Sequence, residues 1–203
     1  MEYRLYTTPA FVLARTPSGE ANSRVWFLTR DLGLIQANAQ AARSLASKHR
    51  YGLQTLSLSV VSVVRGKSGW RVTSVMPQYS YYSRLNSSTA AVDVAAKVAL
   101  ALRTLCAGEE HQPELFTIFT EVVNSLSEDS LNYKECRAIE CIALLRILSR
   151  LGYVGDDKLL IPFTSSSGFD QPLIQKVTEH KRNIIRTINK AFEASHLVSA
   201  RYA

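Results

Sequence analysis

The segment from Ala10 to Leu56 alternates short runs of β-forming residues with turn signals. Pro17-Ser18-Gly19 and Asp31-Leu32-Gly33 are turn sequences, because proline and glycine set the dihedral angles that tight turns require. A basic loop over residues 42–52 follows. Short strands cut by such turns are typical of a small antiparallel sheet that bends towards closure. This pattern constrains the fold more than any other feature of the chain.

Five strands are predicted before residue 80. They span residues 8–16, 23–29, 34–39, 53–64 and 70–75. In the fourth strand the inward parity changes between Val60 and Val61, which we interpret as a β-bulge that turns a barrel corner. The strands and basic loops together favour an OB-type barrel. Periodicity alone leaves an SH3-like barrel as the alternative.

After residue 80 the hydrophobic period changes from two residues to 3.6, which is typical of helices. Helices are predicted over residues 90–106, 114–127 and 131–151, and a last one from the cap Asp170 to about His196. The predicted fold class is therefore α+β. A five-stranded OB-type domain over residues 1–80 precedes an all-α helical bundle domain over residues 81–203.

The positive charge of the chain is unevenly placed. The formal net charge is +7, and residues 1–80 hold ten basic and three acidic side chains, whereas residues 81–203 hold fourteen of each. A β-domain that carries the whole excess predicts a polyanionic partner such as nucleic acid. A chance distribution over a small surface is the alternative.

Candidate DNA contacts come from the basic loop 42–52, the next hairpin and the second strand. The seven cations are Arg24, Arg43, Lys48, Arg50, Arg65, Lys67 and Arg71. Two basic loops on one barrel can form a groove that follows a phosphate backbone. Tyr51 and Trp70 are candidates for stacking on unpaired bases. Solvated loop charges are the alternative for the cations, and a place in the core is the alternative for the aromatic rings.

The sequence carries no motif of the common catalytic or metal sites. Glu109-Glu110 and Asp156-Asp157 are interpreted as solvated loop charges. The three cysteines form no C-x-x-C pair, so buried thiols are expected rather than disulfides or zinc ligands. We therefore expect a non-enzymatic protein without a cofactor or metal ion.

The apolar runs are too short to span a bilayer, and the first residues contain no apolar block of the kind found in signal peptides. We therefore expect a cytoplasmic protein with no membrane partner.

One family resemblance follows the order of short motifs along the chain. The motifs are Val12-Leu13, Pro17, Gly19-Glu20, Ser23, Leu28-Thr29, Gly33, Ala39, Arg43, Ser47-Lys48 and Leu53-Gln54. This pattern resembles the N-terminal OB domain of the RecO family of recombinational DNA repair proteins. The sequence L-L-R-I-L-S-R-L-G-Y from Leu144 and the segment 184–201 are similar to the family's later helices.

The resemblance implies a mediator that binds single- and double-stranded DNA and anneals complementary strands. It also implies a RecR-like clamp, the C-terminal tail of SSB and, indirectly, RecA as partners, and association with the nucleoid. Arg43 and Lys48 would belong to the DNA face, with Arg24 beside them. An adaptor that recruits SSB or RecR with little DNA activity, or an OB-type RNA-binding protein, are the alternatives.

The chain departs from the family pattern at three places. Residues 154–203 contain no cysteine, where family members commonly carry a zinc module. Gln40 and Ser44 replace a usual glycine and a usual basic residue, and Thr55-Leu56 replaces proline-phenylalanine. The first departure predicts a metal-free helical domain, and the others predict weaker DNA binding or a larger share of partner binding.

Overall fold

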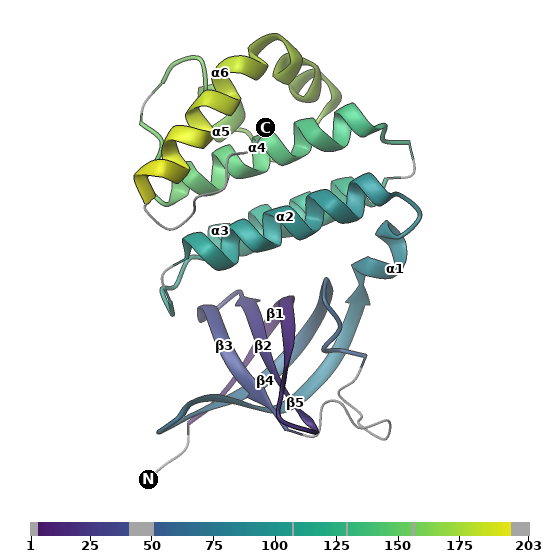
Figure 1. The fold of residues 1–203 in the computed structure, drawn as a ribbon, viewed down its shortest axis with the longest axis vertical. Helices are drawn as coiled ribbons and strands as arrows, with labels where there is room; N and C mark the ends of the chain where they lie inside the picture. Colours follow the sequence, from purple (N-terminus) through teal and green to yellow (C-terminus); the bar gives the residue numbers. More distant parts are fainter. Residues whose placement is uncertain (1–3, 41–50, 107, 129, 156, 196–203) are drawn as a thin grey trace. The chain divides into compact units, whose positions relative to one another are not determined.

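The computed structural model describes residues 4–40, 51–106, 108–128, 130–155 and 157–195. Its elements, labelled in Figure 1, are β1 Leu5–Ser18, β2 Asn22–Thr29, β3 Gly33–Ala39, β4 Ser57–Gly66, β5 Gly69–Ser80, α1 Tyr81–Leu85, α2 Thr89–Leu105, α3 Pro113–Leu126, α4 Tyr133–Arg150, α5 Ile161–Thr164 and α6 Gln171–Ser195. Five strands are followed by helices, so the predicted α+β fold class is confirmed.

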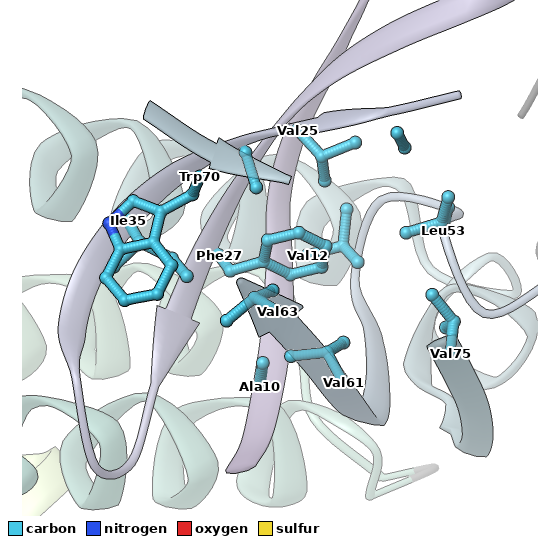
Figure 2. Close-up of a cluster of buried hydrophobic side chains, with 12 residues drawn as sticks. Ala10, Val12, Val25, Phe27, Ile35, Leu53, Val61, Val63, Trp70 and Val75 are labelled. Carbon is cyan, nitrogen blue, oxygen red and sulfur yellow. The ribbon is translucent and has the colours of Figure 1, made fainter. Parts of the chain in front are cut away.

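The strands close into a barrel in the order β1-β2-β3-β5-β4. β1 pairs with both β2 and β4, whereas β3 and β5 run parallel. This closed five-stranded order is that of an OB-type barrel. Its interior holds alternate residues of the strands, together with Leu53 from the turn before β4 (Figure 2). The alternation follows from the strand period of two, which sends successive side chains to opposite faces.

The predicted bulge at Val60 and Val61 is wrong. Ser57, Ser59, Val61 and Val63 are all buried, so the inward parity of β4 does not change. The strand begins at Ser57, and its first inward positions are serines, which a search for apolar alternation passes over. Ser59 Oγ donates a hydrogen bond to the Gly52 carbonyl oxygen at 2.9 Å, which allows this hydroxyl to be buried.

The irregularities of strand pairing lie in β5, which pairs with β4, and in β1, which pairs with β2. Pairing between β4 and β5 passes from Ser62↔Ser74 to Val63↔Val72, and a second shift follows Leu58. Pairing between β1 and β2 shifts between Val12 and Ala14. Such extra residues increase the local twist, which helps a short sheet to close.

The described residues divide into two compact units. The first contains the barrel, residues 81–84 and the segment 108–116, and the second contains residues 85–106 and 117–195. In the second unit α4 packs against α2, α5 and α6. An Asn132–Glu135 capping box fixes the start of α4. The boundary predicted at residue 80 stays a prediction, because packing does not test which segment folds alone.

Candidate nucleic-acid interface

Arg24 and Arg71 lie in one row across the outer surface of the barrel. Arg24 pairs with Asn38 in the β2–β3 ladder, and Asn38 pairs with Arg71 in the β3–β5 ladder. Their chain neighbours Val25 and Trp70 point into the core. All three members of the row are exposed. Two strand spacings separate the arginine backbones, which is about 10 Å.

A shallow groove adjoins this row. It is lined by Ala39, Gln40, Arg71, Val72 and Thr73. Gln40 directly precedes the segment 41–50, which carries the predicted contacts Arg43, Lys48 and Arg50 and lies outside the described residues. The groove therefore adjoins the point at which the chain enters its most basic segment.

The β4–β5 hairpin carries Arg65 and Lys67, and both side chains are exposed. The Arg65 guanidinium forms an ion pair with Glu109 at 2.8 Å and lies 5.6 Å from the Trp70 ring centroid. In the described part of the chain, Arg24, Lys67 and Arg71 form no ion pair. Of the four candidate DNA contacts that the structure describes, three are thus available to an anionic ligand, while Arg65 is already paired.

Trp70 belongs to the barrel core, so its prediction as a base-stacking residue is wrong. It is 6% exposed and lies among the core side chains in Figure 2. Its ring meets Tyr6 edge to face at 5.4 Å between centroids. Its indole Nε1 donates a hydrogen bond to Glu109 Oε1 at 2.8 Å. The ring has no free face for a base, because the Trp70 side chain points into the core while that of the next residue, Arg71, is exposed. Trp26 is half-buried, and Tyr51 is 72% exposed.

The segment 108–116 lies along the barrel in the first unit. The Glu110 carbonyl oxygen would lie 2.0 Å from a Cβ built on Gly33, so only glycine fits there. His111 Nδ1 donates a hydrogen bond to the Asp31 carbonyl oxygen at 3.1 Å. Phe116 packs on Phe11 at 5.1 Å between ring centroids. These contacts show that the described barrel is completed by residues from beyond α2.

Asp31 is held ionised at this contact. The Thr8 hydroxyl donates a hydrogen bond to Asp31 Oδ2 at 2.7 Å and lowers the pKa of the carboxyl below its ordinary value. Arg30, which lies 3.2 Å away, lowers it further. A carboxylate stabilised in this way repels phosphate, so this end of β2 is a poor place for DNA.

A second hollow lies between α4 and α6. Apolar residues including Leu144, Val177 and Ile188 line it together with the cations Lys134, Arg137 and Lys181. Arg137 pairs with the buried Glu140. Burial raises the pKa of the Cys141 thiol in this hollow to about 11, so the sulfur stays protonated and unreactive near neutral pH. An apolar floor with a basic rim suits an acidic peptide that has a hydrophobic side chain.

Neither a metal site nor a membrane span occurs in the part of the chain that the structure describes. No group of three or more His, Cys, Asp or Glu side chains there could hold a metal ion. None of the described helices combines the length and apolar character needed to cross a membrane.

Comparison with known proteins decides the family. The family model described as "Recombination protein O N terminal" matches residues 1–79, which include β1 to β4 and nearly all of β5. A curated relative, the DNA repair protein RecO of Desulfitobacterium hafniense, is 31% identical over 153 residues, which are 73% of this chain and 52% of the relative. The chain belongs to the RecO family.

Two further relatives carry the same name. The DNA repair protein RecO of Heliobacterium modesticaldum is 29% identical over 150 residues, covering 74% of this chain and 52% of the relative. That of Dehalococcoides mccartyi is 37% identical over 82 residues, covering 40% of this chain and 32% of the relative. The chain spans about half the length of the RecO proteins of Desulfitobacterium hafniense and Heliobacterium modesticaldum that it matches.

Glu109 is the main residue of the site whose place the sequence does not predict. A loop acid next to another acid is ordinarily solvated, but Glu109 binds Arg65 and Trp70 of the barrel. It lies outside the range that the RecO family model matches. The one available signal is the long acid-free span between Asp31 and Asp93, which leaves the cations of β4 and β5 without a local partner.

Proposed function

We propose that the chain acts in DNA repair and recombination as a non-enzymatic mediator. It binds single- and double-stranded DNA, anneals complementary strands and helps to load RecA on SSB-coated DNA. Membership of the RecO family supports the general role, and the charge of the barrel supports the binding mode. The proposed place of action is the nucleoid in the cytoplasm, where these partners meet DNA.

The Arg24–Asn38–Arg71 row is the observation that carries the proposal. It places Arg24 and Arg71 on the outer face of an OB-type barrel, beside the groove at Gln40, and neither forms an ion pair with another described residue. Between Asp31 and Asp93 the chain has no acidic residue and seven basic ones. A face of this kind attracts a phosphate backbone and releases its counterions, which favours binding most strongly at low salt.

Annealing follows from charge neutralisation. Two complementary strands repel each other through their phosphates, and cations held on a rigid barrel lower this repulsion while the base edges remain free to pair. Arg43, Lys48 and Arg50, which lie outside the described residues, are proposed as further phosphate contacts. Lys67 would contact phosphate from the β4–β5 hairpin, and Arg65 would do so only after leaving Glu109.

The test measures annealing of two complementary oligonucleotides by fluorescence quenching at low and moderate salt. We expect the protein to accelerate annealing, more strongly at low salt. For the binding constant K of a single strand, log K falls as log salt rises. The variant Arg24→Ala/Arg71→Ala should make this slope shallower by about 1.4, because each lost phosphate contact contributes about 0.7.

The matched control is Arg150→Ala/Lys158→Ala, which removes two exposed cations from the second unit. It should retain the wild-type slope. An equal loss in both variants would show that net charge alone is responsible, and an unchanged slope in the barrel variant would remove the row from the interface.

The hollow between α4 and α6 supports a second function, recruitment of SSB. We propose that it takes the acidic, hydrophobic C-terminal tail of SSB, with carboxylates at Lys134 and Lys181 and an apolar side chain against Leu144 and Val177. The RecR-like clamp is also a proposed partner, without a surface assigned to it.

Fluorescence anisotropy of a labelled SSB tail peptide tests this groove. The variant Lys134→Glu/Lys181→Glu should abolish binding, whereas Arg150→Glu/Lys158→Glu should not. If the peptide binds but the protein does not accelerate annealing, then the chain is an adaptor with little DNA activity. If the groove variant binds the peptide normally, then the tail does not dock there.

A further inference from the structure

The last helix, α6, carries a row of cations on its outward face. Arg182, Arg186 and Lys190 follow one another at intervals of four residues, so they lie on one face of the helix. All three are exposed, whereas Ile184 and Ile188 are buried against the rest of the unit. Successive cations of the row are spaced by roughly 6 Å along the axis, which is the rise of four helical residues. We call these three residues the α6 row.

The charges of the α6 row are not neutralised within the described part of the chain. None of its members forms an ion pair with another described residue. Arg186 Nη2 donates a hydrogen bond to Asn183 Oδ1 at 3.4 Å, and this partner is an uncharged amide. Residues 171–195 contain five basic and two acidic side chains, although residues 81–203 as a whole are balanced. The helix therefore holds a positive excess that the rest of this half of the chain offsets.

A shallow hollow follows the row. It is lined by Arg182, Ile185, Arg186, Asn189, Lys190 and Glu193. No acidic residue occurs between Arg182 and Lys190, and Glu193 ends the row one helical turn further on. A ligand that lies along this hollow meets three positive charges in succession. Such a ligand is a polyanion that carries its charges at regular intervals.

The character of the hollow separates a nucleic acid strand from an acidic peptide. Peptide and protein partners are usually anchored by a large apolar side chain in a pocket. The hollow between α4 and α6 has such an apolar floor, whereas the hollow along the row offers only the half-buried Ile185. Binding here depends on charge, and guanidinium groups match phosphate oxygens in a forked geometry. These properties favour a phosphate backbone, which cations bind without regard to sequence.

The two compact units thus each present a row of cations. The barrel carries the Arg24–Asn38–Arg71 row, and the α6 row belongs to the other unit. Annealing requires that two strands are held together. We propose that the α6 row binds the phosphates of a second single DNA strand while the barrel binds the first. This inference rests on the proposed function, because it gives a site to the second strand of the same reaction.

The test counts DNA strands on each chain. Native mass spectrometry is applied to the full chain with a dT oligonucleotide of about ten nucleotides, a length that one OB fold can hold. We expect two strands on the wild-type chain and one on the variant Arg182→Gln/Arg186→Gln. Affinity for the second strand should fall at least about tenfold at low salt, because two phosphate contacts that each contribute about 0.7 to the salt slope are lost. Affinity for the first strand should stay at the wild-type value, and annealing should become slower.

Two further variants control the result. Arg182→Lys/Arg186→Lys should keep two strands, because the positive charges remain. Arg150→Gln/Lys158→Gln removes two exposed cations of the same unit that lie outside α6, and it should also keep two strands. Binding of the SSB tail peptide should be unchanged in the glutamine variant of the α6 row, because the hollow between α4 and α6 keeps its lining.

The outcomes distinguish the two claims. If the wild type binds no DNA, the proposed function and this inference both fail. If the wild type binds one strand per chain and still accelerates annealing, only the inference fails. Two strands on the glutamine variant would also refute the α6 row. A labelled polyglutamate peptide is the last probe: if the glutamine variant loses this peptide but keeps two strands, the row is a surface for an acidic protein and the proposal is overturned.

Discussion

Glu109 binds the edge of Trp70 across a separation of 39 residues in the chain, with 2.8 Å between Glu109 Oε1 and the indole Nε1. Its other oxygen, Oε2, lies 2.8 Å from Arg65. One carboxylate thus satisfies the single polar atom of a core tryptophan and neutralises a cation of the same hairpin. Two consequences follow, one for stability and one for DNA binding.

For stability, Glu109→Ala should destabilise the protein by about 1–3 kcal/mol, because the part-buried indole N–H loses its acceptor. Urea unfolding followed by tryptophan fluorescence measures the change. Glu110→Ala is the matched control, because Glu110 lies in the same segment and, among the described residues, its side chain bonds only Gln112. It should change stability by less than about 0.5 kcal/mol. Equal stability of the two variants would contradict a supporting role for Glu109.

For DNA binding, Glu109→Gln should keep an acceptor for Trp70 while releasing the Arg65 charge. We expect tighter binding of a single strand and a salt slope steeper by about 0.7, as one more phosphate contact forms. Salt titration of oligonucleotide anisotropy measures both. In an Arg65→Ala background the same glutamine substitution should have no effect on the slope. A persistent effect in that background would mean that Glu109 acts through general repulsion of DNA.

Strand parity and turn residues were sufficient to predict five strands, and the order of short motifs was sufficient to indicate the RecO family. They could not predict the row of Arg24 and Arg71, because that row depends on the parallel pairing of β3 with β5. Turn signals specify local hairpins only.

Trp70 and Glu109 show the same limit. The alternation in β5 says that Trp70 and Arg71 face opposite ways, but not which of them faces the core. A loop acid reveals nothing of its partner when that partner lies far away in the chain. The bulge prediction failed for a different reason, since Ser57 and Ser59 occupy inward positions that apolar patterning assigns to other residues.

Gly33 lies where segment 108–116 contacts the barrel, so a substitution there tests this contact. Gly33→Ala should destabilise the protein by more than about 2 kcal/mol, because its φ of +69° is unfavourable for alanine and its Cβ would meet the Glu110 carbonyl oxygen. Gly19→Ala is the matched control, with a φ of +71° and nothing within 4 Å of the Cβ. It should cost only about 1–2 kcal/mol. Thermal unfolding of both variants by circular dichroism isolates the steric part, and equal losses would argue against the contact.

Arg146 is the polar centre of the second unit and is only 3% exposed. It donates hydrogen bonds to the carbonyl oxygens of Phe163 at 3.0 Å and Gly168 at 2.7 Å, and pairs with Glu121 at 3.3 Å. Arg146→Ala should destabilise the unit by about 3–5 kcal/mol, since it leaves a carboxylate and buried carbonyl groups unpaired.

Urea unfolding measured by far-ultraviolet circular dichroism tests this value. Arg150→Ala, which removes an exposed arginine at the end of the same helix, should change stability by less than about 0.5 kcal/mol. A small loss for Arg146→Ala would mean that water replaces the guanidinium at low cost.

Glu140 makes the stability of the second unit depend on pH. Its side chain is 2% exposed, and burial raises the pKa of its carboxyl, although Arg137 and Lys97 oppose this shift. The folded state therefore binds the proton more tightly than the unfolded chain, where a glutamate titrates near about 4.3. The protonated form stabilises the fold below that pH, and this contribution is lost as the pH rises through the raised folded pKa.

Glu140→Gln removes this titration and keeps an oxygen that accepts a hydrogen bond from Arg137. The difference in unfolding free energy, variant minus wild type, should therefore increase as the pH rises from 4 to 7, and urea titrations at several pH values measure it. Glu193→Gln, at an exposed position of α6, controls for the change in net charge. A difference that stays flat or falls with pH would show that the Arg137 ion pair outweighs burial, and that the folded pKa of Glu140 is not raised.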